Sequence, residues 1–111
     1  RGSGEAFASD RHALRLAKLA IGRGHDMRVK EPERQFFYIP LMHSEMLADQ
    51  ERALRLILMN MPKTGAINVE HGIKHRDVIR RFGRFPSRNA ALGRTDTEAE
   101  LAYRAEGGYM S

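Results

Sequence analysis

The sequence predicts an all-α domain with about five helices, and three observations support this fold class. Apolar residues recur at spacings of three and four along most of the chain, which is the period of an amphipathic helix. Glycine and proline separate these periodic segments at intervals typical of short helices. The one run with high strand propensity, residues 36–39, has no second such run to pair with, and an unpaired strand leaves its backbone polar groups unsatisfied.

Composition limits the classes of protein that fit. The 111 residues suffice for one small domain with a single core, so we expect residues 1–111 to form one helical domain. The absence of cysteine excludes disulfides and thiolate metal sites and makes a cytoplasmic location the default expectation. No apolar run is long enough to span a bilayer. The formal net charge of +5 favours acidic partners without selecting one.

The first predicted helix covers residues 5–23. Ser3 or Gly4 can open it, and the Gly22-Arg23-Gly24 stretch can end it, since glycine adopts the left-handed conformation of a helix C-terminus without strain. Residues 25–31 mix charges between glycine and proline, so we expect an exposed connection without chemistry. The apolar face of the helix is broad and comprises Phe7, Leu14, Ala17 and Ile21, flanked by Ala13, Leu16 and Ala20.

A short second helix is predicted over residues 32–39. Pro32 suits the first turn of a helix, and Glu33 complements its positive end. A strand is the competing interpretation, which the lack of a pairing partner disfavours. Pro40 is expected to break or kink the chain, because the residue before a proline is pushed away from helical dihedrals. The side chains that this helix would bury are Phe36, Phe37 and Ile39.

Two longer helices follow. The third is predicted over residues 44–61, with Ser44 as its N-cap. Its apolar stripe comprises Leu47, Leu54, Leu58 and Met61, beside Ile57. After a turn, the fourth helix runs over residues 66–82 with Gly83 as its stop, and two histidines replace apolar residues on its inner stripe, an inconsistency that can mark a site. That stripe comprises Ile67, His71, His75, Val78 and Phe82, with Ile79 adjacent.

The end of the chain is predicted to contain a short helical turn over residues 87–92 and one further helix that ends near Ala105. Thr97 and Glu100 form a capping box, in which each side chain satisfies a backbone amide of the other, and this motif starts the last helix. Residues 106–111 are expected to fray.

The densest chemical signal is residues 80–94, which contain five arginines, two phenylalanines and two glycines. We interpret this segment as a hinge between two helices. Its phenylalanines would anchor it in the core, while Gly83 and Pro86 would turn the chain. Arg84 and Arg88 would then face the acidic side chains and histidines of the third and fourth helices.

Several spaced motifs occur in order along the chain: His43-Ser44-Glu45, Leu47, Asp49-Gln50-Glu51, His75, Arg81-Phe82-Gly83-Arg84-Phe85-Pro86-Ser87-Arg88-Asn89 and Leu92-Gly93-Arg94. Together they resemble the uncharacterised bacterial family DUF924. The resemblance implies a tetratricopeptide-like fold of antiparallel helix pairs, without an established activity. Arg1-Gly2 resembles the end of an earlier family motif, so the chain is expected to correspond to the C-terminal part of the family domain. Ser87 stands where the family usually has histidine, which weakens any mechanism that needs an imidazole there.

The histidines have a metal-binding and an acid–base interpretation. His71 and His75 have the four-residue spacing that lets two imidazoles share a metal, and His43 with Glu45 could complete the set. Without an HExxH pattern or cysteine, we favour hydrogen-bonded structural histidines and expect no metal or cofactor. His43, Glu45 and His75 could also exchange protons near neutral pH if half-buried. A glutamate near a helix start is routine dipole chemistry, so we again favour a structural role.

The arginines have two interpretations that can hold together. Arg84, Arg88 and Arg94 lie in turns near short helix ends, where guanidinium groups and backbone amides could hold an anion. Alternatively, they pair with acidic residues across helices and fix the fold. We favour the pairing, because a buried arginine normally needs a carboxylate partner. The acidic candidates are Glu45, Asp49 and Glu51.

We therefore predict a helical-repeat-like binding module whose polar pocket takes an acidic peptide or a small anion. The predicted site residues are His43, Glu45, His75, Arg84, Arg88, Asn89 and Arg94. A small hydrolase or transferase using His75 and Glu45 is the first alternative, and a basic nucleic-acid-binding protein is a less favoured second one. We lean against enzymatic activity, expect no membrane partner, and expect that the broad apolar stripes could pair two copies of the chain.

Overall fold

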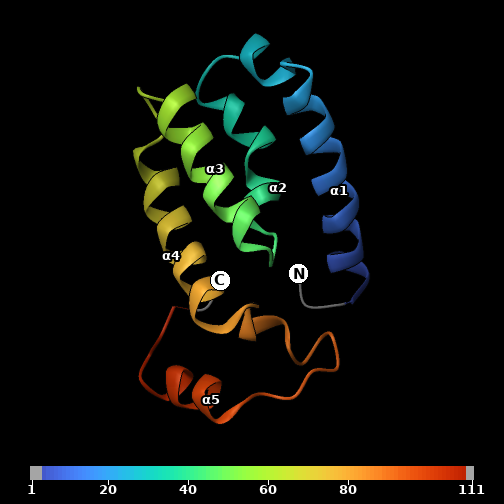
Figure 1. The fold of residues 1–111 in the computed structure, drawn as a ribbon, viewed down its shortest axis with the longest axis vertical. Helices are drawn as coiled ribbons and strands as arrows, with labels where there is room; N and C mark the ends of the chain where they lie inside the picture. The colour runs from blue at the N-terminus through green and yellow to red at the C-terminus, as the bar shows by residue number, and fades with distance from the viewer. Residues whose placement is uncertain (1–3, 110–111) are drawn as a thin grey trace.

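The computed structural model describes residues 4–109, and within that range the chain is all-α, with five α-helices and no strand (Figure 1). The helices are α1 (Gly4–Gly22), α2 (Ile39–Met42), α3 (Leu47–Asn60), α4 (Ala66–Phe82) and α5 (Glu98–Ala105). Short 3-10 helices span His25–Arg28, Glu33–Phe37 and Pro86–Arg88. The predicted fold class and number of helices are therefore confirmed. Among these residues, none of the helices has the length and apolar character needed to cross a membrane.

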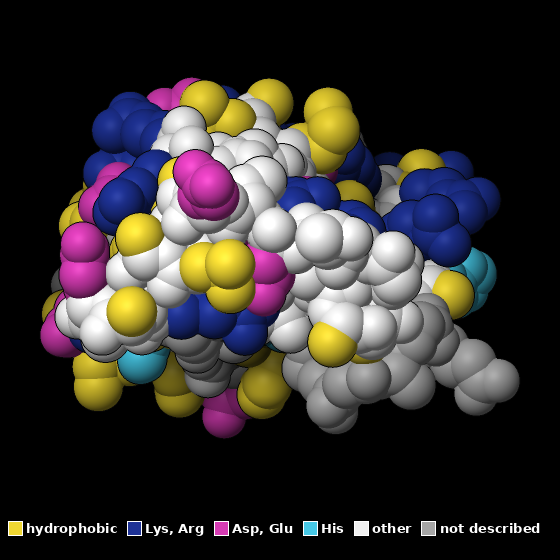
Figure 2. Space-filling model, turned by 90° about the horizontal axis from the view of Figure 1, so that it is seen from below, with side chains coloured by type: hydrophobic (Ala, Val, Ile, Leu, Met, Phe, Trp, Pro, Cys, Tyr) yellow, Lys and Arg dark blue, Asp and Glu magenta, His cyan; other side chains and the backbone are white. Residues whose placement is uncertain are grey.

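Helices α1 to α4 lie beside one another, and α5 lies across one end of this group (Figure 1). Helix α2 packs between α1 and α3 (Figure 1). The most extensive contact between two helices is that of α3 with α4, which run antiparallel (Figure 1). Seen from below, the molecule carries Lys and Arg in several separate groups, with Asp and Glu among them (Figure 2).

Two hydrophobic cores hold the helices together. The larger core lies where α1, α2 and α3 meet, and its buried members are Ala17, Tyr38, Leu41, Met42, Ala53, Ile57 and Met61. The smaller core joins the end of α4 to the segment after it, and it comprises Val78, Ile79 and Phe85, with Phe82, Tyr103 and Tyr109 packed against it. Phe85 is 1% exposed and so anchors residues 80–94 as predicted, whereas Phe82 is only half-buried.

Helix α1 begins and ends within one residue of its predicted bounds. Gly24 follows it with φ 76°, the left-handed conformation predicted for this helix end. The predicted breadth of the buried face is wrong, because Leu16 is 54% exposed and Ala13 is also exposed. Only the central stripe packs against the larger core, so the flank of α1 stays at the surface. Ser3, one of the two predicted helix starts, lies outside the described residues.

The predicted exposed connection over residues 25–31 is confirmed for most of its residues but is wrong at Asp26. Asp26 is 2% exposed, because its carboxylate accepts a hydrogen bond from the hydroxyl of Tyr38. Asn60 donates to the same hydroxyl at 3.1 Å, which ties this segment to the end of α3. Burial and the bond to Asp26 raise the pKa of Tyr38 to about 12, so the hydroxyl keeps its proton at neutral pH.

The helix predicted over residues 32–39 forms in part as a 3-10 helix with a different buried face. Phe36 is 65% exposed, the other two apolar side chains expected in the core are half-buried, and Tyr38 is fully buried instead. A 3-10 helix has three residues per turn, so other positions face the core than in an α-helix. Pro40 does not break the chain, because it occupies the first turn of α2, where its missing N–H leaves no hydrogen bond unmade.

Helix α3 starts at Leu47, three residues later than predicted, and Ser44 is not its N-cap. The Ser44 hydroxyl instead donates to Asp49 at 2.6 Å and accepts from the backbone amide of Met46 at 3.1 Å, which fixes the turn before the helix. Leu47 and Leu58 of the predicted stripe are exposed. Because α2 and α4 both pack on α3, the buried positions of α3 are those that face these two helices. They are Asp49, Gln50, Ala53, Leu54 and Ile57.

Helix α4 has its predicted bounds, and Gly83 ends it with φ 71° as predicted. The first half of its predicted inner stripe is wrong, because Ile67 is 65% exposed and His71 is also exposed. In the second half, His75, Val78 and Ile79 are buried and Phe82 is half-buried. The ring of Phe85 covers only the end of α4, so the beginning of the stripe faces solvent.

The predicted capping box of α5 is confirmed, with Thr97 and Glu100 each satisfying a backbone amide of the other. The prediction that residues 106–111 fray is wrong as far as Tyr109. The hydroxyl of Tyr109 lies 3.2 Å from Nε2 of His75, and its carbonyl accepts a hydrogen bond from a tyrosine hydroxyl of α5. Apolar and polar contacts with α4 and α5 thus hold this part of the tail. Residues 110–111 lie outside the described range.

Gly65 lies where the turn between α3 and α4 approaches the end of α3, and it provides a test of this hairpin. An added Cβ would lie 2.6 Å from the carbonyl oxygen of Met61 and 2.9 Å from Cγ2 of Ile57. A backbone carbonyl cannot rotate away, so we expect Gly65→Ala to lower the free energy of unfolding by about 1–3 kcal/mol. Urea unfolding followed by circular dichroism measures this change. In the control Gly22→Ala the new Cβ meets nothing within 4 Å, and equal losses in both variants would contradict the prediction.

Candidate functional site

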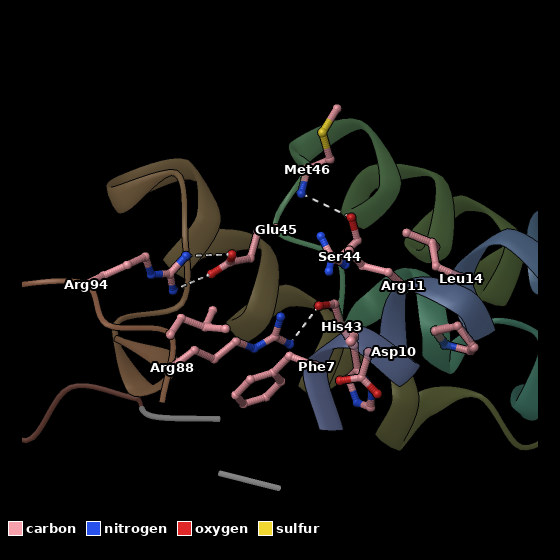
Figure 3. A pocket seen from close by; sticks show the side chains of 13 residues that line it. Phe7, Asp10, Arg11, Leu14, His43, Ser44, Glu45, Met46, Arg88 and Arg94 are labelled. Carbon is pink, nitrogen blue, oxygen red and sulfur yellow. Dashed lines mark hydrogen bonds and ion pairs between the residues drawn. The ribbon is translucent and has the colours of Figure 1, made fainter. Parts of the chain in front are cut away.

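A cavity of about 460 Å³ opens between α1, the chain before α3 and the segment after α4 (Figure 3). Four of the seven predicted site residues line it: His43, Glu45, Arg88 and Arg94. The other lining residues are the charged Asp10 and Arg11, the polar Ser44, and the apolar Phe7, Ala8, Leu14, Pro40, Met46 and Leu92. The cavity therefore combines apolar walls with a few charged groups, which is typical of small-molecule sites.

Glu45 and Arg94 form one wall of the cavity (Figure 3). Both terminal nitrogens of Arg94 donate to the carboxylate, at 2.9 and 3.0 Å, which confirms the predicted pairing of an arginine with Glu45. The backbone amide of Phe85 donates to the same carboxylate at 2.6 Å. Burial alone would raise the pKa of Glu45, but the hydrogen bonds from Arg94 and Phe85 hold it below its ordinary value. Glu45 is therefore ionised at neutral pH.

Arg94 makes further contacts that commit most of its donors to the fold. Its Nε donates to Oδ1 of Asn89 at 3.0 Å, and one terminal nitrogen also donates to the carbonyl of Phe85 at 3.2 Å. A guanidinium group has five N–H donors, and these bonds together with the Glu45 pair use most of them. Arg94 thus shapes the cavity more than it offers donors to a ligand.

Arg88 reaches the cavity from the 3-10 helix Pro86–Arg88 and lies against two aromatic rings. Its guanidinium carbon is 4.6 Å from the ring centre of Phe85 and 4.9 Å from that of Phe7. One terminal nitrogen donates to the carbonyl of His43 at 2.7 Å (Figure 3). The ring quadrupoles attract the cation, so these contacts fix a positive charge between α1 and the segment after α4.

Arg84 and Asn89, two predicted site residues, bind Glu100 and do not line the cavity. Arg84 donates to the two carboxylate oxygens at 2.9 and 2.7 Å, and the Asn89 amide donates at 3.2 Å. The hydrogen bond from Arg84 is the main cause that lowers the pKa of Glu100 to about 2. Burial acts in the opposite direction, and the hydrogen bond from the Thr97 amide lowers the pKa further. The prediction that Arg84 faces acids of the third helix is wrong, because the carboxylate of the α5 capping box lies closer.

The other two acidic residues considered as arginine partners lie on α3 and pair elsewhere. Asp49 binds the ammonium group of Lys18 on α1 at 2.8 Å. Glu51 pairs with Arg80 of α4 at 3.4 Å, in an exposed contact. Exposed pairs of this kind contribute little to stability, so the Arg80–Glu51 pair adds less than the half-buried Arg94–Glu45 pair of the cavity.

His75 does not line the cavity, although it lies near His43 and Phe85. It is 8% exposed, and its ring centre lies 5.7 Å from that of Phe85, 5.6 Å from that of Tyr109 and 6.3 Å from that of His43. These distances are typical of aromatic packing. His71 is exposed on α4, and within residues 4–109 no three His, Cys, Asp or Glu side chains are placed to hold a metal ion.

None of the five residues of α1 that line the cavity is among the predicted site residues: they are Phe7, Ala8, Asp10, Arg11 and Leu14. Arg11 is exposed and makes no hydrogen bond or ion pair with another residue of the described range. Phe7, Arg11 and Leu14 are four and three residues apart, so helical periodicity places Arg11 beside the predicted apolar stripe. That spacing could have identified Arg11, although the sequence does not show what faces it.

Charges in the cavity are nearly balanced. Three guanidinium groups, those of Arg11, Arg88 and Arg94, accompany two carboxylates, those of Asp10 and Glu45. One net positive charge remains when the histidine is neutral. Because Arg94 is committed to Glu45, Arg11 is the cation best able to meet a ligand. The arrangement can bind an anion, whereas the ionised Glu45 is not poised to exchange protons near neutral pH.

Residues 1–108 match the family model described as "Bacterial protein of unknown function (DUF924)". A solved structure described as "Structure of Protein of Unknown Function ATU0120 from Agrobacterium tumefaciens" is similar to this chain, with a TM-score of 0.85 and 45% sequence identity. The similarity covers 96% of this chain and 58% of that one, so this chain spans less than two thirds of the length of its relative. No curated protein matches the chain.

Proposed function

Because the chain belongs to the DUF924 family of bacterial proteins of unknown function, we propose a role from its own geometry: a helical binding module whose pocket takes an acidic peptide or a small anion. The supporting observation is the cavity to which three separate elements contribute arginines: Arg11, Arg88 and Arg94. Guanidinium groups recognise carboxylate and phosphate with a planar fork of donors. Arg88 and Arg94 are already held by other residues, so they lose less side-chain entropy on binding, which favours affinity.

We further propose that the helices follow a tetratricopeptide-like arrangement, as the family resemblance implies. The antiparallel α3–α4 hairpin supports this, and α1 and α2 provide neighbouring helices (Figure 1). Stacked helix pairs form extended surfaces on which other molecules bind. The cavity opens beside α1, at the edge of this group of helices, where a peptide or small anion would have access.

The proposal is tested by ligand binding to the full 111-residue chain and to the variant Arg11→Gln. We expect at least one member of a panel of phosphate, small carboxylates and short acidic peptides to raise the melting temperature. Loss of one charge-assisted hydrogen bond should then weaken binding roughly tenfold or more in Arg11→Gln. Isothermal titration calorimetry measures the dissociation constants.

Arg15→Gln is the matched control, because Arg15 is an exposed arginine of the same helix that does not line the cavity. It removes the same charge from the molecule and should leave the dissociation constant unchanged. If no anion of the panel stabilises the wild type, or if both variants weaken binding equally, the proposal fails.

The two alternative functions have less support. An acid–base pair of His75 and Glu45 would need a carboxylate that can take up a proton, whereas Glu45 is bound by an arginine fork and His75 does not line the cavity. For nucleic acid binding, the basic stretch of α4 is partly neutralised by pairs such as Arg76–Asp77. Basic and acidic side chains are also mixed on the face seen in Figure 2.

A further inference from the structure

We propose that the ligand of this cavity is a hydrophobic monocarboxylate, a molecule with one carboxylate on an apolar body. This inference rests on the proposed anion-binding function and narrows its ligand class. It excludes polyanions such as oligophosphates and peptides rich in glutamate. The cavity size of about 460 Å³ lies within the range of small-molecule sites, roughly 300–1,000 Å³.

The charge balance of the cavity favours a single negative charge on the ligand. Glu45 and Asp10 both line the cavity, and the Glu45 carboxylate stays ionised through its bonds to Arg94. One added carboxylate neutralises the remaining positive charge. A second negative group on the same ligand would meet these carboxylates in a partly enclosed site, where like charges repel more strongly than in water.

The position of Arg11 defines where the carboxylate binds. Arg11 is exposed at the cavity and makes no hydrogen bond or ion pair with another described residue, so its fork can meet a carboxylate in a bidentate pair. Arg88 adds a second positive charge to the lining, and the rings of Phe7 and Phe85 hold it. The two side chains come from elements far apart in sequence and lie on one cavity (Figure 3).

The apolar lining indicates what the carboxylate is attached to. Phe7, Leu14 and Pro40 form the inner apolar surface, and Met46 and Leu92 extend it outward. Met46 is 65% exposed and Leu92 is 38% exposed, so both present apolar surface to water. An apolar chain lying along them would remove that surface from water, which is the main source of affinity for such ligands.

The experiment is calorimetric titration of the full chain with hexanoate, octanoate and decanoate. We expect each added CH₂ to tighten binding by up to about fourfold, the value for complete burial of the group. Octanamide, which has nearly the same shape without the charge, should bind at least tenfold more weakly than octanoate. Met46→Gln should reduce the dependence on chain length, whereas the control Met59→Gln, at an exposed methionine outside the cavity, should not.

Two sources of a hydrophobic carboxylate are distinguished in the same titrations. N-acetyl-Leu-Leu represents the C-terminus of an apolar peptide, and its C-terminal amide is the matched neutral form. Tighter binding of the peptide acid than of octanoate identifies a peptide C-terminus as the better ligand, and the reverse order identifies a fatty acid. Either order supports the ligand class.

Other outcomes overturn the inference. Equal affinity for octanoate and octanamide would show that the cavity does not recognise the carboxylate. If pyrophosphate or citrate bound more tightly than octanoate and lost affinity in Arg11→Gln, the monocarboxylate class would be wrong while the proposed anion-binding function stood. If none of these compounds bound, the inference and the proposed function would both fail.

Discussion

Substitution Glu100→Gln is expected to lower the free energy of unfolding by about 2–3 kcal/mol. Glu100 is 1% exposed and accepts hydrogen bonds from Arg84, Asn89 and the backbone amide of Thr97. Glutamine keeps the shape but leaves the Arg84 guanidinium without its carboxylate. Breaking a fully buried ion pair costs about 3–5 kcal/mol, and the 25% exposure of the Arg84 side chain lets water compensate for part of it. Urea unfolding at pH 7 measures the difference.

The dependence of this effect on pH supplies an independent check. The bond from Arg84 is the main reason that the pKa of Glu100 falls from 4.5 to about 2. The carboxylate therefore contributes its full stabilisation above about pH 4.5 and loses it as the pH falls toward 2. The gap between wild type and variant should narrow over the same range. A gap that stayed constant down to pH 2 would contradict the assignment, and Glu98→Gln, at an exposed position of the same turn, should change little at any pH.

Phe85→Ala is expected to destabilise the chain by about 3–4 kcal/mol. The ring of Phe85 is 1% exposed and belongs to the smaller core. It contacts the ring of His75 and the guanidinium group of Arg88. Removing a buried ring leaves a cavity in addition to the lost transfer free energy. Because Arg88 would lose one of its two aromatic faces, anion binding should weaken as well. Thermal and urea unfolding, with titration of the best ligand, measure both effects.

Phe36→Ala is the matched control for this substitution. Phe36 is 65% exposed, so its removal should change the free energy of unfolding by less than about 0.5 kcal/mol. Similar losses in the two variants would show that Phe85 does not anchor the segment after α4. If Phe85→Ala lost stability but bound the ligand as tightly as the wild type, Phe85 would stabilise the smaller core without supporting ligand binding in the cavity.

Helix ends were predictable where the signal lies within a few residues of chain. Gly83 ends α4, and the Thr97–Glu100 capping box starts α5, because both motifs act on neighbouring backbone groups. The buried face of residues 32–39 was not predictable in the same way. Tyr38 is buried in preference to Phe36 because its hydroxyl donates to Asp26, a buried residue within the connection after α1.

The candidate site was predictable as a set of residue types but not as a set of contacts. An arginine that pairs with Glu45 could be expected, since buried charges need partners, but the choice of Arg94 depends on a contact between residues 49 positions apart. The pairing of Arg84 with Glu100 likewise depends on the position of α5, which local sequence does not determine. Arg11 lines the cavity because of the segments that face α1, and periodicity along one helix does not reveal those segments.

Ionic contacts account for much of the attachment of α5. Arg84 pairs with Glu100, and Arg104 pairs with Asp96 at 3.2 Å and donates to the carbonyl of Pro86. The core between α1, α2 and α3 is apolar by contrast. Dissolved sodium chloride screens exposed charges far more than buried ones. Ionic strength is therefore expected to act unequally on the two ion pairs at this end of the molecule: concentrated salt weakens the more exposed Arg104–Asp96 pair before the buried Arg84–Glu100 pair.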